Sequence, residues 1–150
     1  MSQIYTSTKS FHPTKTGLNR QWYLIDASTT SLGRLSTIVA RLLMGKNRAD
    51  YNPGVDMGAC VIVTNAKNLV LTGKKMEKKV YFRHEDGRIG ALKHRTMAQQ
   101  MAKDCKKPVY LSIRGMLPKN RLKDVRMNTR LHIFEENHNF GTNIQELITL

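Results

Sequence analysis

One short stretch of the sequence places several hydrogen-bond donors beside a rigid corner. A helix-like apolar segment reaches Gly115 and should stop at Pro118, because proline has no N–H to donate and disfavours helical geometry in the residue before it. Lys119, Asn120 and Arg121 follow at once. Donors fixed in this way could hold a phosphate group, and no acid, base or nucleophile accompanies them. The stretch therefore predicts phosphate binding and not catalysis.

The charge of the chain predicts that the phosphates belong to a polyanion. Lys and Arg number 25 against 11 Asp and Glu, which gives a net charge of +14. Such a chain repels itself unless a polyanion neutralises it. Residues 73–130 hold 17 of the basic residues and 5 acidic ones, a net +12. Tyr81, Phe82 and Tyr110 lie among these cations, although aromatic residues are more often core than base-stacking platforms. The pattern supports phosphate contacts and does not support base-specific readout.

The elements that must carry these residues read as a parallel α/β fold. Apolar strands are predicted at 22–26 and 60–64, and the helix between them should begin after Ser31 and end at Gly45. Two strands that are apolar throughout, joined by a helix, are typical of a parallel sheet covered by helices. Further strands are predicted at 69–72, 79–83 and 131–134, with helices at 94–106 and, less clearly, 108–116.

Other residues that could do chemistry lack the rest of a site. Asp26 ends the first strand, where open parallel sheets often bind ligands, but the loop after it has no glycine-rich phosphate cradle. Gly73-Lys74 lacks the earlier glycine of a P-loop. Cys60 and Cys105 lack zinc-site spacing, and Cys60 is expected to be a buried, reduced thiol. The sequence thus predicts no catalytic residue, no metal and no cofactor. A small nucleotide-binding enzyme on the same sheet is the alternative.

A series of short motifs runs along the chain in a recognisable order. The motifs are Trp22–Ala27, Leu32–Leu35, Gly45-Lys46, Tyr51–Pro53, Asp56 with Gly58, Val61–Ala66, Thr72–Lys75, Lys79–Tyr81, His84, Gly87–Gly90, Leu92-Lys93 and Gly115–Pro118. Over roughly residues 20–135 this series resembles the ribosomal protein L13 family of bacterial and organellar large subunits. The resemblance implies a three-layer α/β/α single domain with a small, mainly parallel four-stranded sheet. It also implies a structural protein that binds rRNA and supports subunit assembly, and not an enzyme. A translational regulator with RNA targets off the ribosome is a further alternative.

The resemblance implies which residues face the RNA. They are Lys46, Lys74, Lys75, Lys79, Arg83, Lys93, Arg114, Lys119 and Arg121. Local charge alone adds Arg88, Arg95, Lys123 and Arg126, and His84 and Asn120 complete the predicted set. The expected partners are large-subunit rRNA and neighbouring large-subunit proteins. Neither a membrane span nor a homo-oligomer is expected.

The ends of the chain differ from its middle. Residues 1–20 are predicted to be a basic N-terminal extension, residues 21–135 the domain, and residues 136–150 a tail. No acidic residue precedes Asp26, as in organelle-targeting segments, although an ordinary basic tail fits equally well. The stretches 121–124, 130–134 and 138–141 look closer to mitochondrial members of the family than to bacterial ones. A mitochondrial ribosome is therefore expected, with a plastid or the bacterial cytoplasm as the alternative.

Overall fold

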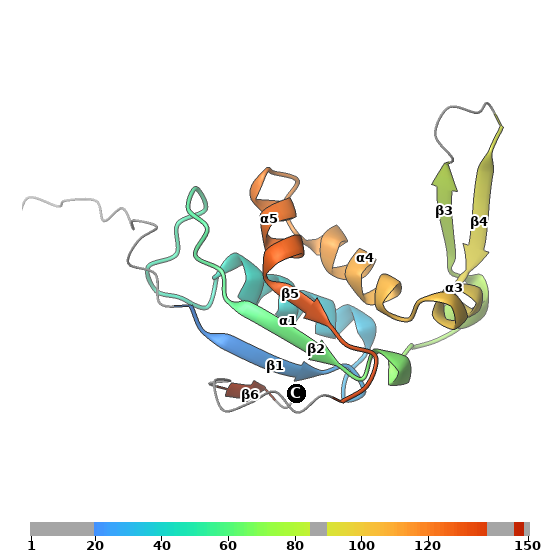
Figure 1. Ribbon diagram of the computed structural model, residues 1–150, viewed down its shortest axis with the longest axis horizontal. Coiled ribbons are helices and arrows are strands. Elements are labelled where there is room, and N and C mark those ends of the chain that lie inside the picture. Colours follow the sequence, from blue (N-terminus) through green and yellow to red (C-terminus); the bar gives the residue numbers. More distant parts are fainter. Residues whose placement is uncertain (1–19, 85–89, 138–145, 149–150) are drawn as a thin grey trace, which may run out of the picture.

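The main sheet of the protein has four strands that pair in parallel. The computed structural model describes residues 20–84, 90–137 and 146–148 (Figure 1). The strand order is β5-β2-β1-β6, and the bounds are β1 Trp22–Asp26, β2 Cys60–Thr64, β5 Leu131–Ile133 and β6 Glu146–Ile148. The predicted class, an α/β domain with a small, mainly parallel sheet, is confirmed.

One face of this sheet carries the hydrophobic core, because side chains alternate between the two faces along a strand. Ile25 of β1 and Val63 of β2 lie side by side on that face and are fully buried. Helix α1 (Leu32–Met44) packs on β2, α4 (Lys106–Met116) packs against α1, and α5 (Leu122–Thr129) packs against β5. Figure 1 shows all three on the same side of the sheet. The described residues thus supply two of the three expected layers, the sheet and one layer of helices.

Helix α1 begins and ends where the sequence predicts. Ser31 is its N-cap, with an extended backbone, and Gly45 follows its last residue with φ at +80°. The Gly45 N–H donates to the Leu42 carbonyl at 3.0 Å, and the next N–H donates to the Arg41 carbonyl at 3.1 Å. This geometry suits glycine alone, since a Cβ here would lie 2.8 Å from the Met57 carbonyl oxygen.

A two-stranded antiparallel hairpin stands beside the helical layer (Figure 1). It consists of β3 (Val80–His84) and β4 (Leu92–Thr96). The short helix α2 (Lys75–Lys78) precedes it, and α3 (Met97–Lys103) follows it directly. The hairpin has few buried side chains of its own, so α2 and α3 fix its position.

Two local predictions differ from the structure, and one helix was not predicted. The helix predicted from His94 is wrong in its first three residues, which pair with β3; a capping box formed by Thr96 and Gln99 sets the helix start. The strand predicted at 69–72 reduces to one bridge between Val70 and Ser31. Helix α5 was not predicted, because it is mostly polar and buries only two residues.

A short 3₁₀ turn, η2 (Ala66–Asn68), follows β2 in the chain. None of the described helices is long and apolar enough to cross a membrane.

Candidate nucleic-acid interface

One face of the hairpin is cationic. Arg83 pairs with Lys93 across the two strands, and Arg95 lies beside Tyr81 in the same register, so the three cations share a face. Lys103 of α3 and Lys107 of α4 lie opposite them. These five residues line a cavity of about 420 Å³, here called the hairpin cleft. None of the described residues that line it is acidic, so its field favours anions.

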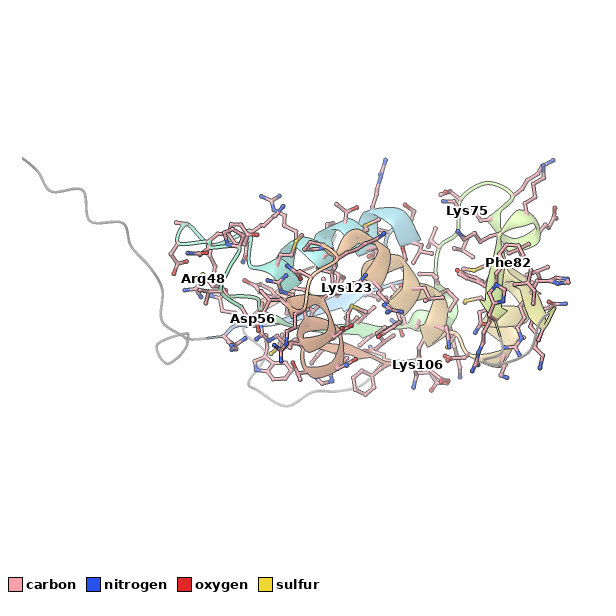
Figure 2. The ribbon with its side chains drawn as sticks, turned by 90° about the horizontal axis from the view of Figure 1, so that it is seen from above. Arg48, Asp56, Lys75, Phe82, Lys106 and Lys123 are labelled. Atoms are coloured by element: carbon pink, nitrogen blue, oxygen red, sulfur yellow. The ribbon has the colours of Figure 1, made fainter. Side chains whose placement is uncertain are left out.

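Phe82 is the most exposed large apolar side chain of the described residues, with 67% of its surface open. It lies on the hairpin at one end of the molecule (Figure 2), and it pairs with His94 across the two strands. Its neighbour Tyr81 is different: its hydroxyl donates to the Met97 sulfur at 3.2 Å, and burial raises its pKa. Lys79 sits over the Tyr81 ring at 5.7 Å. The general expectation that aromatic residues belong to the core therefore fails for Phe82.

The corner at the end of α4 matches its prediction. The helix ends at Met116, and Leu117 is extended, as expected for a residue before proline. The Asn120 N–H donates to the Pro118 carbonyl at 2.9 Å, which closes a tight turn before α5. Lys119, Asn120 and Arg121 are all exposed here.

A second cavity lies beside this corner. Its volume is about 360 Å³, and we call it the corner cavity. Its polar lining consists of Lys46, Tyr51, Asn120 and Arg126, with Met44, Pro53, Met116, Leu117 and Pro118 supplying the rest. Lys46 and Asn120 are distant in sequence, and the packing of α1 against α4 brings them to one place.

The predicted RNA-facing residues differ in accessibility. Those exposed are Lys46, Lys74, Lys75, Lys79, Arg83, His84, Lys93, Arg114, Lys119, Asn120 and Arg121. Arg95 and Lys123 are half-buried, and Arg88 lies outside the described residues. Lys103 and Lys107 of the hairpin cleft were not in the predicted set, although both lie in the basic segment 73–130.

Arg126 departs from the expected exposed position. It is 1% exposed, and its Nε lies 3.5 Å from Oδ1 of Asp56. The same carboxylate accepts hydrogen bonds from both terminal nitrogens of Arg130, with Nη1 at 2.6 Å. Nη1 of Arg20 lies 3.8 Å from its Oδ2. Burial lowers the pKa of both buried guanidiniums. Sequence could have hinted at this cluster only through Asp56, which belongs to the ordered motifs.

Asp26 is engaged within the fold. Its Oδ1 accepts the Ser28 N–H and hydroxyl, each at 2.8 Å, and its Oδ2 accepts the Asn65 amide at 2.9 Å. Burial opposes ionisation of this carboxyl, but the hydrogen bonds outweigh it and lower its pKa. The carboxylate thus ties the end of β1 to the end of β2 and has few lone pairs left for a ligand.

Both cysteines are buried within the fold. Cys60 is buried and unbridged, as predicted, and so is Cys105; burial raises the pKa of each thiol. Within the described ranges, no group of three His, Cys, Asp or Glu residues is placed to hold a metal ion.

The fold and these cavities define a basic α/β domain whose open surface suits phosphate groups. The chain belongs to the ribosomal protein L13 family, whose profile matches residues 20–139. It is similar to large ribosomal subunit protein uL13 of Lactiplantibacillus plantarum, with 45% identity over 117 residues, 78% of each chain. The protein of the same name from Lactobacillus johnsonii is 52% identical over 105 residues, 70% of this chain and 71% of the relative. That of Thermotoga petrophila is 46% identical over 117 residues, 78% and 77% of the two chains.

Proposed function

We propose that the protein is a structural constituent of the large ribosomal subunit that binds and stabilises large-subunit rRNA, and so supports subunit assembly and translation. Membership of the L13 family and the names of the bacterial relatives support this role. The observation that carries the proposal is the hairpin cleft, whose described lining contains five cations. Neighbouring large-subunit proteins are the further partners.

The mechanism is neutralisation of phosphates on separate RNA segments. Helix α4 links the two basic regions, because Lys107 in its first turn lines the hairpin cleft and the Pro118 corner follows its last residue. Eleven helical residues span about 16 Å, so the two regions are held at a fixed separation. Arg114 is exposed on α4 between them. When cations fixed in this way bind RNA phosphates, the counterions of the RNA are released. The bound cations then hold the packed RNA strands together.

Sedimentation and salt titration together test this proposal. The protein in native extract is expected to migrate with the large subunit and to leave it in high salt with RNase. Arg83→Gln and Lys93→Gln should each weaken binding of purified protein to large-subunit rRNA and lower the salt slope by about one unit. The same change at Arg41, exposed on α1 outside both cavities, is the control. A wild-type protein that sediments free of ribosomes and binds rRNA without salt dependence would contradict the proposal.

The absence of enzymatic activity belongs to the same proposal. The rival, a nucleotide-binding enzyme, requires a ligand at Asp26 and the loop after it, yet that carboxylate is already bound to Ser28 and Asn65. The rival expects saturable mononucleotide binding that survives high salt and is lost in Asp26→Asn. Equilibrium dialysis with ATP and GTP separates the two proposals.

For the compartment, we propose a mitochondrial ribosome, on the acid-free N-terminal sequence and the Lys123-Asp124 dipeptide. The alternative is a plastid or the bacterial cytoplasm, and the bacterial relatives fit the bacterial cytoplasm. Imaging of a tagged full-length chain in cells of the source organism distinguishes these compartments.

A further inference from the structure

The cluster around Asp56 contains more buried positive charge than negative. Arg126 and Arg130 are both buried and share one carboxylate, with Arg20 at the edge of the group. Arg130 occupies both oxygens of Asp56, which leaves Arg126 a single 3.5 Å contact through Nε. Nη2 of Arg126 is buried and has no hydrogen-bond partner among the described residues. A buried cation without a full complement of partners costs stability, so a reason for its retention is required.

The place of Arg126 supplies that reason. Its side chain lines the corner cavity, whose polar residues otherwise are Lys46, Tyr51 and Asn120. Lys46 and Asn120 are exposed, Tyr51 is half-buried and Arg126 is buried, so the two exposed donors form a rim above a cationic floor. None of the described lining residues carries a negative charge. The volume of about 360 Å³ is far larger than the ~30 Å³ that a water occupies.

We propose that the corner cavity is a binding site for one phosphate group, with Lys46 and Asn120 as rim donors and the Arg126 guanidinium as the charge beneath. The site deepens the proposed function and rests on it, because the phosphate belongs to the rRNA backbone. Free phosphate has the same chemistry and is the second source. In the bound state the anion supplies the negative charge that the buried cluster lacks. Arg126 acts mainly through its field, because its side chain is almost closed to solvent.

Arg126→Met is the informative variant, because methionine keeps an unbranched side chain and removes the charge. Asp56 keeps Arg130 as its bidentate partner, so the thermal midpoint of the free protein should be unchanged or higher. If this variant does not fold, Lys46→Met carries the test, since it removes an exposed rim cation. Arg41→Met is the matched control, with the same loss of charge at an exposed site outside the cavity lining.

Two measurements apply to all four proteins. The first is the thermal midpoint during titration with inorganic phosphate at constant ionic strength. Wild type and Arg41→Met should rise, whereas Arg126→Met and Lys46→Met should lose most of that rise. The second is the Kd for a large-subunit rRNA transcript. Arg126→Met should weaken binding roughly tenfold and Arg41→Met less than twofold.

The outcomes separate this inference from the proposed function. Weakened rRNA binding in the two cavity variants, with or without the phosphate response, supports the site with RNA as its source. Loss of the phosphate response alone supports a site for free phosphate. If both cavity variants match Arg41→Met in both measurements, the inference is overturned, and rRNA binding by wild type leaves the proposed function standing. Failure of wild type to bind rRNA overturns the proposed function itself.

Discussion

Arg130 holds Asp56 through both terminal nitrogens and also donates to the Gly58 carbonyl at 3.0 Å. Asp56 lies in the loop before β2, and Arg130 directly precedes β5. The Arg130 carbonyl in turn accepts the Val61 N–H at 2.8 Å. One buried ion pair thereby fastens the edge strand β5 to the centre of the sheet.

Asp56→Asn should therefore destabilise the fold strongly. The change leaves two buried guanidiniums without a counter-charge, and breaking a buried pair in this way costs about 3–5 kcal/mol. Urea denaturation measures the free energy of unfolding. Asp50→Asn is the control, because Asp50 pairs with Arg48 at an accessible site and its loss should change stability little. Equal stability of the two variants would refute the structural role of the Asp56 pair.

Gly58→Ala should also destabilise the protein, through sterics alone. A Cβ on Gly58 would lie 1.9 Å from the Leu43 carbonyl oxygen, which belongs to the helix backbone and cannot move aside. Overpacking of this kind costs about 1–3 kcal/mol or more. Gly33→Ala provides the opposite expectation, because nothing lies within 4 Å of a Cβ there and alanine favours a helix. The thermal midpoint should fall in the first variant and hold or rise in the second.

Phe82→Ala should weaken rRNA binding without altering its salt dependence. An exposed ring next in sequence to Arg83 can stack on an unpaired base, and such stacking contributes about 1–3 kcal/mol per base. Arg83→Gln, in contrast, removes a phosphate contact and should lower the salt slope. Fluorescence titration over a range of salt concentrations measures both quantities. An unchanged affinity in Phe82→Ala would assign the ring to another partner, such as a neighbouring protein.

The titration of Asp26 should account for part of the loss of stability at low pH. Its pKa lies below the ordinary value of 3.8, so its contribution is present above that pH and is lost as the pH falls through the native pKa. Asp26→Asn keeps one acceptor oxygen and removes the titration. The variant should be less stable than wild type at pH 7, and the difference should shrink below about pH 4. Urea unfolding at pH 7, 4 and 2.5 tests this; a constant difference would exclude the ionic contribution.

The sequence predicted best where the apolar pattern is continuous. Strands β1 and β2 coincide with their predicted bounds, and α1 lies between Ser31 and Gly45 as expected. The start of α3 could not be predicted in this way, since His94 to Thr96 become a strand only by pairing with β3. The sequence pattern of residues 94–96 does not show that they will pair with β3.

The candidate surface shows the same limit. Pro118 fixes the corner by a rule that acts on adjacent residues, so its geometry followed from the sequence. Lys103 and Lys107 reach the hairpin cleft only because α3 and α4 pack beside the hairpin. Arg126 is buried and pairs with Asp56, 70 residues earlier in the chain. Charge counting cannot separate such a residue from the exposed cations around it.

The pairing of β2 with β5 has a consequence for the kinetics of folding. The connection between these strands contains the whole of residues 73–130, so the sheet closes only when that segment has been looped back. Non-local closure of this kind slows folding, and mutual repulsion among the cations raises the barrier further. Added salt or a polyanion screens this repulsion and should accelerate folding. A higher ionic strength should therefore have opposite effects on RNA binding and on folding. It weakens the binding of the protein to RNA and accelerates the folding of the protein.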